Sequence, residues 1–279
     1  MGKGFTVGRK GKNIRRLFIF IALGIVFVMY LSPLMWMVLN TFKTTAQIYN
    51  ETPLLIFKPT LINYRIVLGS NLFRGSFLLS IAMTASSTFL TLLIGTLAGY
   101  AFSRFRIRAK NDIMLFILLT RMIPPIVIVI PIFYIYVNIG LQDTFLGLLL
   151  VFANINLAFS VWIMKGYFDG IPRSIEEAAM CDGYSRLHGF VKLVVPMVVP
   201  GILATAVFCG IFIWNEFLFA SVLTWNRISL MTPKIYTTSG GAGSVSLTIS
   251  FLYSLPMVLF TFLIRKQLLR GISFGVLRS

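Results

Sequence analysis

The feature that most constrains this chain is a series of long apolar segments separated by shorter polar stretches. The first covers residues 17–39, close to the ~20 residues that a helix needs to cross a bilayer. Similar segments cover residues 76–102, 113–137, 145–164, 198–223 and 247–264. No water-soluble domain of 279 residues needs 57% hydrophobic side chains, so the bilayer is the expected solvent. We expect an all-α integral membrane protein with six transmembrane helices.

The distribution of Lys and Arg predicts how these helices are oriented. The formal net charge is +17, which taken alone would also suit a nucleic-acid-binding protein. Under the six-helix topology, however, eighteen of the 25 basic residues fall in the segments of one side and six in those of the other. Cytoplasmic segments are enriched in Lys and Arg, which also contact anionic membrane lipid there. We therefore expect both termini to be cytoplasmic, residues 1–16 to form a basic cytoplasmic N-terminus, and no nucleic-acid partner.

Arg121 is the remaining basic residue, and it lies inside the third apolar segment. A charge near the bilayer centre costs about 3 kcal/mol even on lenient scales, so this side chain should face protein or water. Asn154 and Asn156 lie at a similar depth in the fourth segment and are candidate partners. Arg121 either lines a translocation path or gate, or clamps its helix where Pro124 and Pro125 interrupt the backbone ladder.

A second polar pair, Asn215 and Glu216, lies toward the outer end of the fifth segment. It either contacts a polyhydroxylated solute or external gate, or stabilises helix packing. Glu216 is the only one of the eight carboxylates placed within an apolar segment, which argues against a proton relay through the membrane.

The polar stretch between the fourth and fifth apolar segments, residues 165–196, predicts a short helix with its own start and stop. Ser174 and Glu177 have the spacing of a capping box, and Gly183 is suited to a left-handed turn that ends the helix. Ala178 and Ala179 leave one side of the helix almost without side-chain bulk. Such a helix suits docking into a groove of another protein, although capping boxes alone also open many ordinary interfacial helices.

The chain offers no set of residues typical of catalysis, nucleotide binding or metal binding. The phosphate-binding pattern G-x-x-x-x-G-K-[ST] does not occur, so we expect no ATP hydrolysis by this chain itself. The single histidine, His188, has no Cys or His at ligand spacing, and Cys181 and Cys209 suggest neither a disulfide framework nor a metal site. We expect no catalytic residue and no metal.

The residues from Glu177 to Pro196 resemble the E-A-A loop of ATP-binding-cassette importers. In that family the pattern reads E-A-A-x3-G-x9-I-x-L-P, and Glu177-Ala178-Ala179, Gly183 and Leu193-x-Val195-Pro196 match its spacing. Further stretches are similar to the carbohydrate-uptake branch, and within it to the maltose-type second permease. They are residues 120–125, 131–133, 140–144, 214–217 and 270–275.

The resemblance implies the membrane-domain fold of a type I ABC importer over residues 17–279, in the inner membrane of a prokaryote. The expected partners are a second permease subunit, two ATP-binding cassette subunits that bind ATP and Mg²⁺, and an extracellular solute-binding protein. The expected cargo is a sugar, polyol or glycoside. The resemblance also implies which residues of the loop meet the ATPase: Ser174, Glu177, Ala178, Ala179, Asp182, Gly183 and Pro196.

Two other functions of a membrane protein would require different features in the sequence. An ion-coupled secondary carrier would need intramembrane carboxylates or a sodium site and inverted halves, and the sequence shows neither. An integral-membrane enzyme would need clustered acids, bases or metal ligands at one membrane face, and no such cluster is evident.

Overall fold

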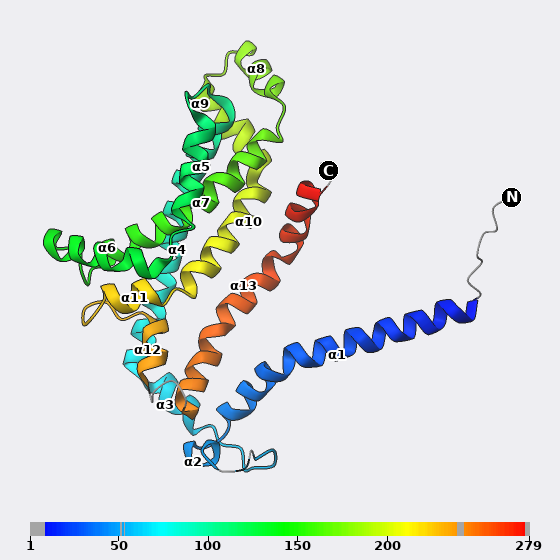
Figure 1. Cartoon of the computed structure of the whole chain (residues 1–279), viewed down its shortest axis with the longest axis vertical. Helices are drawn as coiled ribbons and strands as arrows, with labels where there is room; N and C mark the ends of the chain where they lie inside the picture. The colour runs from blue at the N-terminus through cyan, green and yellow to red at the C-terminus, as the bar shows by residue number, and fades with distance from the viewer. Residues whose placement is uncertain (1–8, 51, 53, 239–242, 277–279) are drawn as a thin grey trace. The chain divides into compact units, whose positions relative to one another are not determined.

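The computed structural model describes residues 9–50, 52, 54–238 and 243–276, with side chains described between residues 16 and 262 (Figure 1). Within these residues the chain consists of helices joined by turns and loops. The helices are α1 (Arg9–Thr41), α2 (Thr45–Ile48), α3 (Ile62–Gly69), α4 (Asn71–Arg104), α5 (Lys110–Thr120), α6 (Pro125–Ile139), α7 (Phe145–Asp169), α8 (Arg173–Cys181), α9 (Arg186–Gly189), the π-helix η1 (Phe190–Val194), α10 (Val195–Trp214), α11 (Leu218–Leu223), α12 (Met231–Thr237) and α13 (Ser244–Val276).

The apolar segments predicted from sequence are helices long enough to cross a membrane. Five described stretches qualify, in α1, α4, α7, α9–α10 and α13, and a bent pair formed by α5 and α6 brings the number to six if it counts as one crossing. The all-α membrane fold is therefore confirmed.

The third predicted span, expected as one transmembrane helix interrupted at Pro124 and Pro125, is two helices that meet at 90°. α5 ends at Thr120 and α6 begins at Pro125. A residue that precedes a proline avoids the helical conformation, and Pro124 accordingly has an extended ψ of 130°. Two consecutive prolines thus separate the helices instead of bending a single one.

Helices α4 and α7 form the tightest described pair because α4 presents glycine to α7 at residues 95 and 99. A Cβ atom added to Gly95 would lie 2.0 Å from Ser160 Oγ, and one added to Gly99 would lie 2.8 Å from the backbone nitrogen of Lys165. Thr91 Oγ1 donates a hydrogen bond to the carbonyl of Ala153 across the same interface. Glycines four residues apart let helix backbones approach closely in lipid.

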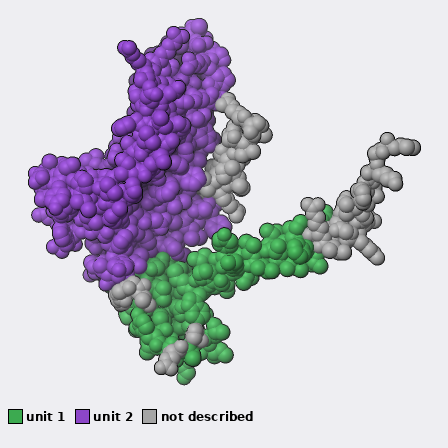
Figure 2. Space-filling model, viewed as in Figure 1, with its two compact units in different colours: residues 1–69, 238–252 green, residues 70–237, 253–279 purple. Residues whose placement is uncertain are grey.

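The chain divides into two compact units, shown in separate colours in Figure 2. The smaller unit contains residues 1–69 and 238–252. Its described part is organised around Asn63, whose Nδ2 donates to the carbonyls of Thr41 and Lys43, both at 2.8 Å. The amide oxygen of Asn63 accepts from Ser244 Oγ at 3.1 Å, so one side chain joins the end of α1, α3 and the start of α13.

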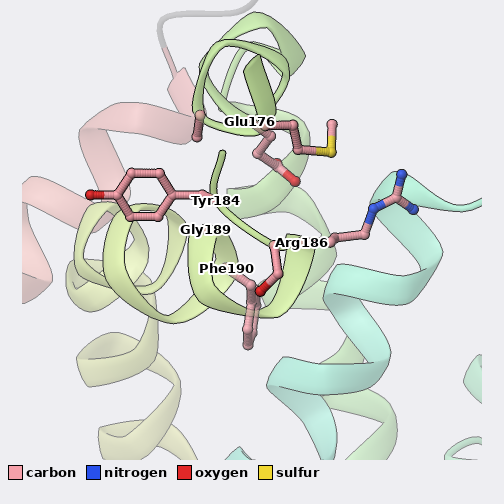
Figure 3. A pocket seen from close by; sticks show the side chains of 8 residues that line it. Glu176, Tyr184, Arg186, Gly189 and Phe190 are labelled. Atoms are coloured by element: carbon pink, nitrogen blue, oxygen red, sulfur yellow. The ribbon is translucent and has the colours of Figure 1, made fainter. Parts of the chain in front are cut away.

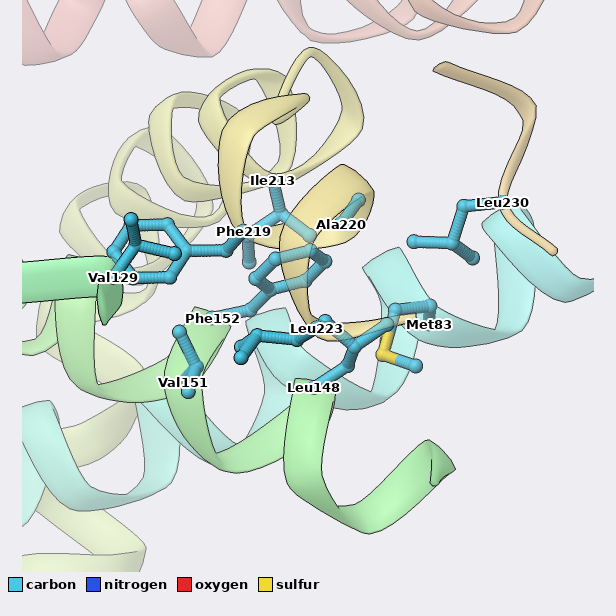
Figure 4. Packing of buried hydrophobic residues seen from close by; sticks show 10 residues of the cluster. All are labelled: Met83, Val129, Leu148, Val151, Phe152, Ile213, Phe219, Ala220, Leu223 and Leu230. Carbon is cyan, nitrogen blue, oxygen red and sulfur yellow. The ribbon is translucent and has the colours of Figure 1, made fainter. Parts of the chain in front are cut away.

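The larger unit contains residues 70–237 and 253–279, and it holds two buried apolar clusters. The first joins α4, α6, α7, α10 and α11 (Figure 4) and includes Met83, Val129, Leu148, Val151, Phe152, Ile213, Phe219, Ala220, Leu223 and Leu230. The second lies beside α8 and includes Tyr100, Met164, Phe168, Phe190, Val194 and Val198. This second cluster is the base on which the candidate site rests.

Candidate functional site

The predicted short helix is α8, although it does not begin as the sequence suggested. Pro172 occupies the N-cap position and the helix starts at Arg173, so Ser174 is already inside it. No side chain caps this end, and the capping box expected from Ser174 and Glu177 is not formed. The fixed φ of proline, here −57°, starts the helix two residues earlier than a serine cap at Ser174 would.

The end of α8 agrees with the prediction. Asp182 is the C-cap residue and Gly183 follows with a φ of +89°, a conformation that side chains with a Cβ resist. The chain then enters α9 with Ser185 as a cap, because Ser185 Oγ accepts a hydrogen bond from the backbone N–H of His188. Gly183 therefore lets the chain reverse between two short helices.

A widened turn connects α9 to α10. Residues 190–194 form the π-helix η1, and Pro196 follows in the first turn of α10. In a regular helix the ring of Pro196 would clash with the carbonyl four residues earlier. The widened turn directly before it keeps α9, η1 and α10 in one continuous apolar stretch, residues 186–214.

The two faces of α8 differ sharply. Ser174, Glu177, Ala178 and Cys181 are exposed, and their spacing of three and four residues places them on one face. Ala179, only 6% exposed, lies on the opposite face beside Gly189. Of the residues that the sequence assigned to the ATPase interface, α8 thus presents Ser174, Glu177 and Ala178 outward and directs Ala179 inward. The other three, Asp182, Gly183 and Pro196, do not divide in this way, because all of them are exposed.

The inward face of α8 is fixed by a residue that the sequence analysis did not single out, Glu176. Tyr100 Oη, from α4, donates a hydrogen bond to Glu176 Oε2 at 2.7 Å. The Arg104 guanidinium, at the end of α4, forms an ion pair with Glu176 Oε1, and the two side chains are only 8% and 14% exposed. Arg104 also donates to the carbonyl of Ile171 at 3.0 Å, in the turn before α8.

Three further contacts complete this end of the bundle. Ser103 Oγ donates to Asp169 Oδ1 at 2.6 Å, and Arg173 donates to the backbone carbonyl of Ser103 at 3.0 Å. Arg186, from α9, places its guanidinium 5.2 Å from the ring centre of Phe105. A shallow depression between α8 and α9 is lined by Glu176, Met180, Tyr184 and Phe190, among others (Figure 3).

A signal for Glu176 was present in the sequence. Two adjacent carboxylates on a helix point about 100° apart, so Glu176 and Glu177 cannot both face the same neighbour. A basic residue at the end of the second span, Arg104, is the counter-charge that the inward carboxylate needs. What the sequence could not provide is which of several arginines between residues 104 and 108 supplies it.

Arg121 lies in the break between α5 and α6, where it caps the end of α5. Its Nη1 donates to the backbone carbonyl of Ile155 in α7 at 2.6 Å. The rings of Phe159 and Phe212 lie 5.8 Å and 5.0 Å from its guanidinium carbon. The pairing with Asn154 or Asn156 suggested by sequence is not seen, because the carbonyl of the residue between them takes the hydrogen bond.

The remaining polar residues of the predicted path are separated. Asn154 is exposed, whereas Asn156 is 3% exposed and donates to the carbonyl of Phe152. Asn215 is exposed, and the carboxylate of Glu216 accepts backbone hydrogen bonds from Phe219 and Ala220 at 2.9 Å and 3.1 Å. Glu216 thus caps the start of α11. Within the described residues no group of three or more His, Cys, Asp or Glu side chains is placed to hold a metal.

The chain is similar in sequence to known membrane transport proteins. Residues 91–273 match the family described as binding-protein-dependent transport system inner membrane component. The chain is 32% identical over 250 residues to the probable ABC transporter permease protein y4oR of Sinorhizobium fredii, with 88% of this chain and 90% of that protein covered. It is 29% identical over 274 residues to the trehalose/maltose transport system permease protein MalG of Thermococcus litoralis, with 95% and 98% covered.

A solved structure shares the fold. A chain from the crystal structure of a bacterial ABC transporter involved in the import of the acidic polysaccharide alginate superposes with a TM-score of 0.77 and 24% identity, covering 95% of this chain and 99% of that one. The predicted importer membrane-domain fold is thereby confirmed. Family match, overall similarity and fold agree, and the chain belongs to the family of inner membrane components of binding-protein-dependent transport systems.

Proposed function

We propose that this chain is one of two permease subunits of an ATP-driven sugar importer, and that α8 is the element that receives force from a separate ATPase. The observation that carries the proposal is the asymmetry of α8. Its inward face is bound to α4 through Glu176, while Ser174, Glu177 and Ala178 remain uncovered. The small side chains leave room for close approach by another protein, and the exposed carboxylate of Glu177 can accept charge-assisted hydrogen bonds from it.

The proposal assigns ATP and Mg²⁺ to the partner ATPase and not to this chain. This assignment is supported by the lack of a phosphate-binding loop in the sequence and by α8, which has one face bound to α4 and the other face exposed. Nucleotide binding between two cassette subunits would favour one conformation of the permease pair over another, and α8 would carry that bias into the bundle.

The proposed cargo is a sugar, polyol or glycoside delivered by an extracellular binding protein. Support comes from the relative MalG of Thermococcus litoralis, a trehalose/maltose transport system permease protein. We further propose that Arg121, Asn154, Asn156, Asn215 and Glu216 lie along this subunit's half of the path. Support for Arg121 is its partial exposure and the guanidinium donors that Ile155 does not use.

Reconstitution of the chain with its partner permease, ATPase and binding protein tests the coupling role. Glu177→Ala and Gly183→Val should reduce binding-protein-stimulated ATP hydrolysis by at least about tenfold, because one removes an outward charge and the other strains a left-handed turn. Membrane insertion should be unaffected, since the Glu177 side chain is exposed and no atom lies within 4 Å of a Cβ added to Gly183. Asp112→Asn, which removes another exposed carboxylate from the start of α5, is the matched control and should retain stimulation. Normal stimulation in both coupling variants would refute the assignment of α8.

A further inference from the structure

We propose that Arg104 is a positioning residue which makes α4 a direct recipient of movement from α8. The chain connects α8 only to α7 before it and to α9 after it. The ion pair with Glu176 adds a non-covalent connection to a third element, the long helix α4, which crosses the whole bundle. This inference rests on the proposed function of α8 and assigns a role to residues on its opposite face.

The first support is the number of elements that one guanidinium joins. Arg104 donates to Glu176 in α8, to the carbonyl of Ile171 before α8, and to Ser103 Oγ at 3.1 Å in α4. Arginine has five donors in a rigid planar arrangement, so these three bonds fix the direction of the group as well as its distance. A lysine would keep the charge but could not hold this geometry.

The second support is burial. The Arg104 and Glu176 side chains are 8% and 14% exposed, so water competes weakly for their ion pair. Breaking one partner of such a pair leaves the other charge without compensation, which is far more costly than losing a surface ion pair. Separating α8 from α4 would likewise leave two charges unpaired, which favours movement of the two helices together.

The third support is the apolar packing directly beneath the ion pair. Tyr100, one turn before Arg104, donates its hydroxyl to Glu176 and places its ring centre 4.4 Å from that of Phe190 in η1 and 5.4 Å from that of Phe168 in α7. Helix α4 is consequently held to α8 by the ion pair, and to α7 and η1, which lie before and after α8 in the chain, by the ring of Tyr100. Movement of α8 then turns or shifts α4 together with α7, which packs tightly along it.

The test uses the assembled transporter, consisting of this chain, its partner permease and the ATPase, in proteoliposomes. A reporter cysteine replaces the exposed Ala85 of α4 in a background with Cys181→Ser and Cys209→Ala, and its labelling rate by a maleimide is measured with and without ATP and Mg²⁺. We expect ATP to change the labelling rate when Arg104 is present. In Arg104→Gln or Glu176→Gln the response should fall by about tenfold, while basal ATP hydrolysis continues because the outward face of α8 is intact.

Matched variants separate positioning from a general loss of structure. Arg106→Gln removes an exposed arginine two residues away and should leave the response unchanged. Arg104→Lys should give an intermediate response, and the exchange Arg104→Glu with Glu176→Arg should restore part of it. If Arg104→Gln does not assemble, Tyr100→Phe removes a single donor to Glu176 and should reduce the response by about twofold to threefold.

The outcomes distinguish this inference from the proposed function. No response to ATP with Arg104 present, or an unchanged response in both Arg104→Gln and Glu176→Gln, would overturn the role of α4. Failure of the ATPase to associate with the chain at all would instead overturn the proposed function of α8.

Discussion

At the scale of single residues, Asp143 is held by hydrogen bonds through both its side chain and its backbone. Its two carboxylate oxygens accept four backbone hydrogen bonds, from Trp225 and Ile228 at 3.0 Å, from Asn226 at 2.9 Å and from Arg227 at 2.8 Å. Its own N–H donates to the carbonyl of Leu223 at 2.9 Å. Asp143 therefore ties the turn between α6 and α7 to the loop after α11.

We predict that Asp143→Asn releases this loop. Burial by itself would raise the pKa of the Asp143 carboxyl, but the four N–H donors outweigh it and lower the pKa to about 2. Asparagine tolerates the left-handed φ of 53° at this position, so the substitution removes the charge without adding backbone strain. Its amide NH₂ cannot accept, which leaves two of the four donors unpaired. Hydrogen exchange of residues 225–228 should become about tenfold faster.

The pH dependence of the same contact has a definite sign. Because the folded pKa of Asp143 is lower than its unfolded value of about 3.9, the stabilisation is complete above pH 4 and is lost as the pH falls toward 2. The rate of hydrogen exchange at residues 225–228 of the wild-type protein should thus approach the rate in Asp143→Asn only near pH 2. Equal exchange in both proteins at pH 7 would contradict the assigned contact.

At the scale of helices, the sequence predicted which segments exist better than how they begin and end. Residue counts and hydropathy were sufficient for α1, α4, α7 and α13, because a span must satisfy its own backbone hydrogen bonds. The separation of α5 from α6 at Pro124 was not predicted, since a proline pair is compatible with either a kink or a break. The start of α8 was wrong because Pro172 and Ser174 both favour a helix start and only packing decides between them.

The candidate site, too, was predicted from the sequence only in part. Spacing and residue type were enough to predict α8 and the left-handed turn at Gly183. They did not predict Glu176 with Arg104, because a contact between residues 72 positions apart leaves no periodic pattern in the sequence. The acceptor of Arg121 was not predicted either, because it is the backbone carbonyl of Ile155, and every residue type carries such a carbonyl.

The interface of α4 with α7 provides a prediction at this scale. Gly99→Ala places a methyl group 2.8 Å from the Lys165 nitrogen and from Met164 Cβ, so the helices must separate, at a cost of about 1–3 kcal/mol. Gly75→Ala, in the same helix, meets no atom within 4 Å and should be neutral or slightly stabilising, because alanine favours a helix over glycine. Thermal denaturation of the detergent-solubilised chain should separate the two variants by several degrees. Similar denaturation temperatures would show that α4 and α7 are not packed as described.

At the scale of the whole molecule, the described helices differ in how much apolar surface they bury within the chain. The most apolar stretch of α7 is 50% buried, whereas that of α1 is 0% buried. Helix α7 contacts both α4 and α10, so it lies at the centre of the larger unit. Within the smaller unit none of the most apolar stretch of α1 is buried, so lipid or protein outside that unit must cover it.

The orientation predicted from basic residues can be measured with the two native cysteines. Cys181 is exposed on α8, and Cys209 is buried with 0% exposure in α10. If α8 faces the cytoplasm, a membrane-impermeant maleimide should label Cys181 in inside-out vesicles and leave right-side-out vesicles unlabelled. The variant Cys181→Ser with Asn226→Cys moves the thiol to an exposed position in the loop after α11 and should show the opposite result.

Because Cys181 shares the uncovered face of α8 with Glu177 and Ala178, added ATPase should also protect it from the reagent. Labelling of Cys181 from the outside would reverse the topology and, with it, remove α8 from reach of any cytoplasmic ATPase.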